Sequence, residues 1–201
     1  MNPRLRMQVY RTTHTLHWIS AAVCFFVLLL FTVTGITLNH ATAISATPKV
    51  TTHEASVPES LRASLAPMDT PTVTPDLGAW LRSEFGVPPS AASAEWSDEE
   101  LYVSAPGPGR DAWVSIDRQT FVARSEITDR GWIAYLNDLH KGRNTGTLWT
   151  LFIDLVAAAC LFFTLTGLVL LQIQARQRTS TWPLVTGGAV LAIALMIFAI
   201  H

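Results

Sequence analysis

Three long stretches with almost no charge constrain this chain more than any other feature. Residues 16–38 and 182–200 contain no Asp, Glu, Lys or Arg, and residues 148–173 contain only Asp154. The stretches are 23, 26 and 19 residues long, and a helix needs roughly 20 residues to cross about 30 Å of hydrocarbon. The sequence therefore predicts an α-helical membrane protein with three transmembrane helices.

Composition excludes several other classes of protein. Charged residues make up 14% of the chain, against about 25% in an average soluble domain. The net charge of −1 leaves no basic surplus for nucleic-acid phosphates. Cys24 and Cys160 both lie in apolar stretches, so we expect neither a disulfide framework nor a CxxC or CxxCH site.

Short-loop charge predicts the orientation. Basic residues precede the first stretch and separate the second from the third: Arg4, Arg6, Arg11, Arg176 and Arg178. Such segments stay in the cytoplasm, so residues 41–147 and the C-terminus should face the other side, which is the periplasm if the membrane is a bacterial inner membrane. The first stretch is longer than the 7–15 residues or so of a secretory signal, which favours an uncleaved anchor.

The segment between the first two stretches has two regions that differ in composition. In residues 41–71, 19 of 31 residues are Ala, Ser, Thr or Pro, which predicts a flexible tether that includes a solvated His53. Residues 72–130 combine a helical pattern over 76–85 with apolar alternation over 101–105 and 112–116 and turns at 106–109 and 117–120, typical of a small α+β domain. The expected divisions are residues 1–40, 41–71, 72–130, 131–175 (an interfacial helix over 131–136 and the second span) and 176–201.

Histidines lie at both ends of the spans. His17 and His40 are 23 residues apart, or about 34 Å along a helix, which is close to one bilayer thickness. His140 directly precedes the second span, so we expect it at the depth of His40. Two neutral imidazoles at one depth can hold a haem iron from both faces, which predicts an outer haem b held by His40 and His140.

The cytoplasmic ends of the spans, called the inner layer here, offer fewer candidate iron ligands than the opposite ends, the outer layer. His14 and His17 are three residues apart on one helix, so they cannot bind one iron from opposite faces. The second span has no histidine at this depth. A two-fold dimer would supply the missing ligand; otherwise, the inner histidines are not ligands.

Each layer also has a glycine and nearby cations. Gly35 lies near the outer layer and Gly167 near the depth of His17, and both leave room for a flat ring to approach the backbone. Cations that could meet haem propionates are Lys141 and Arg143 outside, and Arg11, Arg176 and Arg178 inside.

The histidines, Asp154 and a repeated motif also have interpretations that involve no cofactor. A single histidine at a helix end is usually an interfacial polar residue. Asp154, inside a span, either carries protons or organises the outer pocket, or is a protonated or hydrogen-bonded acid facing Thr or Arg143. Residues 31–38 and 163–170 are identical at five of eight positions, which generic helix-packing motifs partly explain.

Four short motifs accompany the histidines and glycines of the spans: residues 14–18 (HTLHW), 34–40 (TGITLNH), 139–142 (LHKG) and 166–168 (TGL). Together they resemble the PepSY-associated transmembrane helix family, and residues 113–120 (WVSIDRQT) are similar to a strand and turn of the PepSY domain. The resemblance implies a bacterial inner-membrane haem protein with a PepSY-like domain at 72–130, and several members are ferric or ferric-siderophore reductases. It maps membrane histidines onto His17, His40 and His140, with His14 less closely matched. This chain has fewer spans than longer members, which favours a homodimer and leaves its haem count open.

Two main functions follow as hypotheses. The first is a membrane reductase that passes electrons through haem to periplasmic ferric iron or a ferric siderophore. No nicotinamide or flavin fingerprint is present, so its donor would be external, on the cytoplasmic side or a membrane quinol. The second is a membrane-anchored PepSY interaction or regulatory module without redox activity. An assembly factor within a larger iron-uptake complex is a third hypothesis.

Overall fold

The computed structural model describes residues 3–44, 47–66, 72–89 and 94–199. The chain divides into two compact units, one made of residues 1–30 and 151–201 and the other of residues 31–150. The boundaries fall within helices α1 (Pro3–Asn39) and α5 (Thr147–Gln174). Each unit is described separately below.

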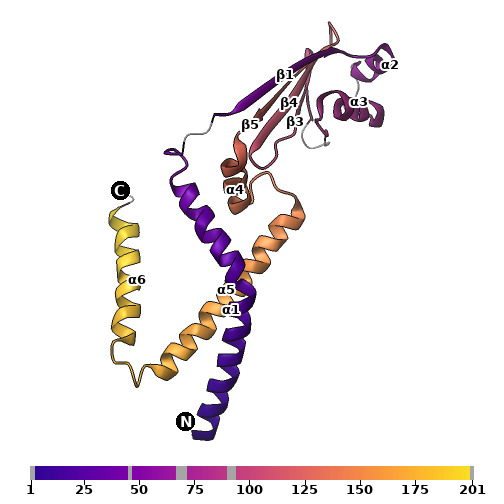
Figure 1. Ribbon diagram of the computed structural model, residues 1–201. Coiled ribbons are helices and arrows are strands. Elements are labelled where there is room, and N and C mark those ends of the chain that lie inside the picture. Colours follow the sequence, from indigo (N-terminus) through magenta and orange to yellow (C-terminus); the bar gives the residue numbers. More distant parts are fainter. Residues whose placement is uncertain (1–2, 45–46, 67–71, 90–93, 200–201) are drawn as a thin grey trace. The chain divides into compact units, whose positions relative to one another are not determined.

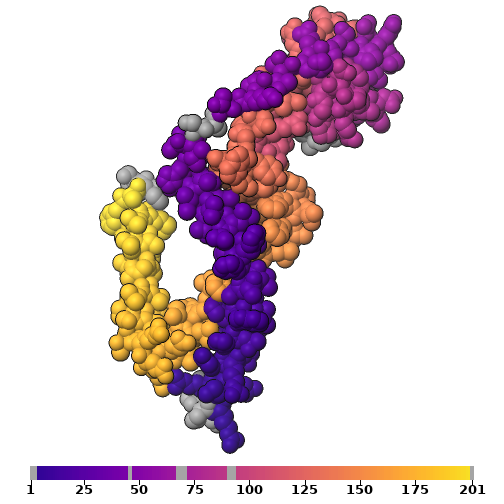
Figure 2. Space-filling model, viewed as in Figure 1, coloured from indigo at the N-terminus to yellow at the C-terminus, as the bar shows by residue number. Residues whose placement is uncertain are grey.

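The first unit is built from helices. It contains the larger part of α1, nearly all of α5, and α6 (Thr181–Phe198). Within the described residues, three helices are long and apolar enough to cross a membrane, as the sequence predicts: Arg4–Asn39, Thr147–Gln174 and Thr181–Phe198. Helix α6 has no buried residue, and Figure 2 shows it (yellow) as a separate rod. Arg6 donates from Nη2 to the carbonyl oxygen of Ile173 at 3.2 Å, which satisfies a free carbonyl near the end of α5.

The second unit contains a five-stranded antiparallel sheet in the order β1-β5-β4-β3-β2. Its strands are β1 (Lys49–Ser56), β2 (Ala94–Trp96), β3 (Glu100–Ser104), β4 (Arg110–Asp117) and β5 (Val122–Asp129). The alternation in 101–105 and 112–116 predicted from the sequence appears in β3 and β4, where Leu101, Val103, Val114 and Ile116 are fully buried.

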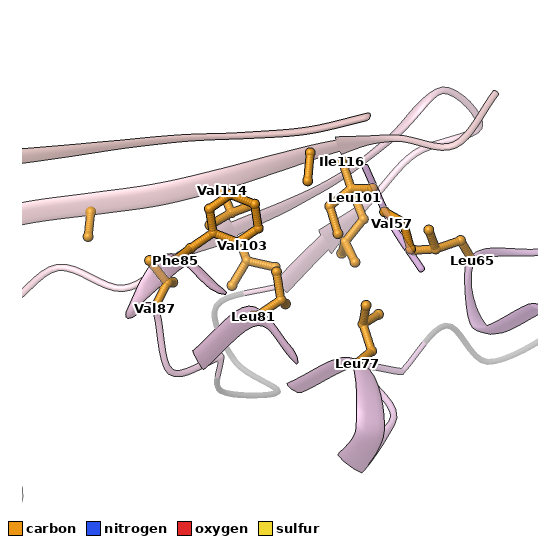
Figure 3. Close-up of a cluster of buried hydrophobic side chains, with 12 residues drawn as sticks. Val57, Leu65, Leu77, Leu81, Phe85, Val87, Leu101, Val103, Val114 and Ile116 are labelled. Carbon is orange, nitrogen blue, oxygen red and sulfur yellow. The ribbon is translucent and has the colours of Figure 1, made fainter. Parts of the chain in front are cut away.

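One face of the sheet packs against α3 (Pro75–Phe85) (Figure 1). Thr74 caps this helix by accepting from the Leu77 amide, and Gly86 ends it at φ 64°, a left-handed conformation that favours glycine. Leu77, Leu81 and Phe85 point from the helix towards the strand side chains (Figure 3). The helix predicted over 76–85 is therefore confirmed.

The prediction of a flexible tether over residues 41–71 is wrong for residues 49–65, and residues 45–46 and 67–71 lie outside the described residues. Residues 49–56 form β1, which pairs with β5 along its whole length from Lys49↔Asp129 to Ser56↔Val122. Helix α2 (Glu59–Arg62) and the 3-10 helix η1 (Ala63–Leu65) follow, and Val57 and Leu65 belong to the core. Thr and Val favour strands once a partner strand is present, so the small, polar composition misled the prediction.

The β4–β5 connection is a tight turn at the predicted residues. The Asp117 carboxylate accepts from the amides of Gln119 and Thr120, both at 2.8 Å. These backbone hydrogen bonds lower the pKa of Asp117 below its ordinary value, because they favour the charged carboxylate.

Helix α4 (Gly131–Lys141) follows the sheet, and Gly142 ends it at φ 66°. The sequence predicts a helix over 131–136, and the structure extends it by a turn and a half. The extension carries Asn137, Asp138 and His140, so it decides the geometry of the candidate site.

Candidate histidine sites

His140 lies in a small cradle formed by the last turns of α1. Its Nδ1 lies 2.7 Å from the hydroxyl oxygen of Thr34, and its ring centroid lies 4.9 Å from that of Phe31. A Cβ added to Gly35 would lie 3.5 Å from Cε1 of the imidazole. The Thr34 hydroxyl also lies 3.2 Å from the carbonyl oxygen of Phe31.

His17 lies in an equivalent cradle on α5. Its Nδ1 lies 3.1 Å from the Thr166 hydroxyl oxygen and 3.2 Å from the carbonyl oxygen of Phe163. The Phe163 ring stacks on the imidazole, with centroids 4.6 Å apart and planes 13° from parallel. A Cβ on Gly167 would lie 3.1 Å from Cε1 of His17, closer than a methyl group normally comes.

The repeated octamer of the sequence makes both cradles. Phe31, Thr34 and Gly35 occupy the same positions in the first copy as Phe163, Thr166 and Gly167 in the second. Each copy offers a ring, a hydroxyl and a glycine to one histidine. The repeat thus has a specific task, and the flat ring that each glycine admits is an imidazole.

Carbonyl oxygens assign the proton in two of the rings. A carbonyl oxygen only accepts, so Nδ1 carries the proton in His17, 3.2 Å from the Phe163 oxygen, and in His40, 3.0 Å from the Ile36 oxygen. The Thr34 hydroxyl can donate or accept, so it holds Nδ1 of His140 in either tautomer. In all three rings Nδ1 is the hydrogen-bonded nitrogen, and Nε2 has no hydrogen-bond partner among the described residues. Histidines that bind metal are commonly held this way, with Nδ1–H donated to an oxygen.

His40 and His140 are not joined by any contact in the described residues. His40 is exposed in the turn that follows α1, whereas His140 is half-buried in its cradle. Their joint ligation of an outer haem therefore stays a prediction. His14 is exposed and lies beside Tyr10, with ring centroids 5.8 Å apart.

The other polar candidates occupy varied positions. Lys141 and Arg143 are exposed near the end of α4, and Asp154 is exposed on α5. His53 lies in β1, where its Nε2 is 3.0 Å from a Glu84 carboxylate oxygen, so it belongs to the sheet domain and not to a tether. Among the described residues, no group of three or more His, Cys, Asp or Glu side chains could hold a metal ion.

An apolar groove of about 500 Å³ adjoins His17. Leucines of α5, Gly167, Gln174 and Val185 of α6 line it together with Phe163. Its volume falls within the range of about 300–1,000 Å³ common for small-molecule sites. One described histidine thus faces a space that could hold part of a flat, apolar group.

Sequence reasoning missed the residues that support His140. Thr37 donates to the Asn137 amide oxygen at 2.8 Å, and Asp138 is 3% exposed beneath the sheet. The available signal was the spacing of Thr34 and Thr37 on one helical face. The position of Asp138 depends on an approach between the β3–β4 turn and α4, which no local pattern indicates.

Comparison with known proteins agrees with the motifs. The PepSY_TM-like family matches residues 8–201. No curated protein and no solved structure matches the chain significantly. Because the match extends over nearly the whole sequence, this chain belongs to the PepSY_TM-like family.

Proposed function

We propose that this chain is an inner-membrane b-type haem protein that carries electrons across the membrane to reduce ferric iron or a ferric siderophore in the periplasm. The N-terminus would be cytoplasmic, and the sheet domain would be a periplasmic insertion between the first and second spans. One observation carries the proposal: the same ring, hydroxyl and glycine cradle is built twice, and each copy holds a histidine with its Nε2 available.

The donor set fits the iron of a haem. Neutral imidazole nitrogen is a common axial ligand, and donation of Nδ1–H to an oxygen makes Nε2 more basic. In His40, Nδ1 is likewise hydrogen-bonded, to the carbonyl oxygen of Ile36. This supports His40 and His140 as the two ligands of an outer haem. Within the chain, His17 has no equivalent second histidine from α5, so the inner site would draw its second ligand from a second copy of the chain in a two-fold dimer.

When bound, haem supplies one-electron redox chemistry. The work of this chain's residues is then to bind, orient and shield. Thr34 and Thr166 hold the rings at fixed angles, and Phe31 and Phe163 cover one side of each imidazole. Lys141 and Arg143 are exposed cations that could meet propionates. The electron donor would be a cytoplasmic partner or a membrane quinol.

Histidine variants test the ligand assignment. The full chain is produced with haem supplied, and haem is measured per polypeptide for the wild type, His17→Ala, His40→Ala and His140→Ala. Each variant should lose at least part of the bound haem. His53→Ala is the matched control, because His53 is paired with Glu84 in the sheet domain and its loss should leave haem unchanged. Full haem content in all three membrane-histidine variants would contradict the assignment.

A second candidate function is a membrane-anchored PepSY interaction module without redox activity. Tyr102 and Trp113 stack with their centroids 6.0 Å apart, and they alternate with core residues of β3 and β4, so they lie on the sheet face opposite α3. Aromatic pairs on an open face suit protein contacts. In this case Tyr102→Ala and Trp113→Ala would abolish the cellular function, whereas the membrane-histidine variants would retain it.

A further inference from the structure

Helix α4 contacts two different parts of the second unit with successive residues. Asn137 and His140 reach the last turns of α1, where they meet Thr37 and Thr34. Asp138 reaches instead the turn between β3 and β4. Because packed protein interiors deform little, a displacement of the β3–β4 turn moves α4, and α4 then moves against the last turns of α1.

Asp138 is buried, and one of its carboxylate oxygens has two hydrogen-bond partners. Its Oδ2 accepts from the Gly109 amide at 2.9 Å and from Nη2 of Arg130 at 2.8 Å, and its side chain is only 4% exposed. Arg130 also forms an ion pair with Asp111 of β4, with Nε and Oδ2 3.2 Å apart. Loss of the Asp138 charge would leave Arg130 only the more exposed carboxylate of Asp111, and would leave the Gly109 amide with a weaker acceptor.

Gly109 brings the turn into direct contact with the backbone of α4. Its φ is 64°, and a Cβ at this position would lie 2.7 Å from both N and Cα of Tyr135. The Gly109 carbonyl also accepts from the Arg130 amide at 2.8 Å. Gly109 therefore both donates a hydrogen bond to Asp138 and accepts one from Arg130, and the turn lies directly against the backbone of α4.

We propose that Asp138 is a positioning residue that couples the sheet domain to His140. It fixes α4 against the β3–β4 turn, and α4 in turn presents the His140 imidazole to Thr34. An event on the sheet domain, such as the docking of an iron complex, thereby reaches the histidine through one buried carboxylate. The proposal rests on the proposed function only for what His140 ligates.

Hydrogen exchange on the full chain tests the mechanical part. Asp138→Asn keeps the size of the side chain and one acceptor oxygen but removes the buried one of the two carboxylates that pair with Arg130. Amides of α4 should exchange at least about tenfold faster than in the wild type. Asp111→Asn is the matched control, because Asp111 pairs with the same Arg130 from a 46% exposed position; it should change exchange less than about twofold.

Ring nitrogen signals test the effect on the histidine. In the dithionite-reduced full chain with ¹⁵N-labelled histidine, Asp138→Asn should shift the Nδ1 and Nε2 signals of His140, assigned by their loss in His140→Ala. The signals of His17 should stay in place, because its cradle belongs to the other unit. This readout separates coupling from a general loss of structure, which would move both.

Three results would overturn the coupling: unchanged exchange and ring signals in Asp138→Asn, equal shifts at His17 and His140, or an equal effect of Asp111→Asn. Absence of haem from the wild type would contradict the proposed function and leave this test valid. The ring signals report the hydrogen bond to Thr34 with or without iron.

Discussion

Thr34 and Thr166 occupy the same position in two copies of one eight-residue motif, and the hydroxyl of each is hydrogen-bonded to Nδ1 of a histidine, at 2.7 and 3.1 Å. Neither histidine lies within the helix that carries its threonine motif. The motif therefore binds an imidazole from another segment, and it engages Nδ1 of the ring and leaves Nε2 without a hydrogen bond.

Replacing Thr34 tests this receptor. Thr34→Val keeps the shape of the side chain but removes the hydroxyl, so the His140 ring loses the hydrogen bond that orients it. Loss of such a supporting hydrogen bond commonly weakens metal affinity about 10–100-fold. We expect haem to be lost from Thr34→Val during dilution, as measured by the Soret absorbance, and Thr34→Ser to retain it. Equal retention in both variants would mean that the hydroxyl has no role in ligation.

The two cradle glycines should differ in their tolerance of a methyl group. Gly167→Ala places Cβ 3.1 Å from the His17 ring, whereas Gly35→Ala leaves an ordinary 3.5 Å to His140. We expect Gly167→Ala to lower the thermal midpoint more than Gly35→Ala does. Gly187→Ala is the control, because nothing lies within 4 Å of its Cβ in α6 and alanine favours a helix; it should be neutral or slightly stabilising. The same loss at all three positions would refute the close approach at His17.

Residues 49–65 should contribute to stability if they belong to the sheet domain. Leu65 is 1% exposed in the core, and removing a buried leucine side chain typically costs about 2–5 kcal/mol. Leu65→Ala should lower the unfolding free energy of the sheet domain in the full chain by an amount in this range, as followed by hydrogen exchange of the strand amides. Val50→Ala, at a 54% exposed position of β1, should cost much less. If Leu65→Ala left the unfolding free energy of the sheet domain unchanged, the interpretation of this segment as a tether would be favoured again.

The Asp117 turn predicts a pH dependence. The lowered pKa of Asp117 means that the carboxylate stabilises the folded turn fully above the ordinary value of 3.8. This contribution is lost as the pH falls from there through the lowered pKa. Amides of the β4–β5 turn should therefore exchange faster in Asp117→Ala than in the wild type at pH 6, and the difference should narrow below about pH 4. A difference that is constant with pH would exclude the carboxylate as its source.

The sequence predicted most elements because their signals are local. The three spans follow from length and lack of charge, α3 from its apolar spacing between Thr74 and Gly86, and the β4–β5 turn from Asp117 and its neighbours. Strand β1 was missed because its stability comes from pairing with β5, about 70 residues later in the chain. A composition rich in Ala, Ser and Thr cannot show such a partner.

The site was predicted in part. Helix depth placed Gly167 near His17, and the structure brings the two into contact. Depth could not reveal that the repeated motif binds the imidazoles, because that contact joins distant segments through side chains of ordinary composition. Asp138 was missed for the same reason: its partners, Gly109 and Arg130, are gathered only by the fold.

The most direct test of the central claim is the absorption spectrum of the purified full chain, oxidised and then reduced with dithionite, after expression with haem supplied. The account predicts a Soret band that shifts on reduction, together with the sharp α and β bands of low-spin haem b ligated by histidine. A preparation without a Soret band, from protein that is folded and complete, would contradict it.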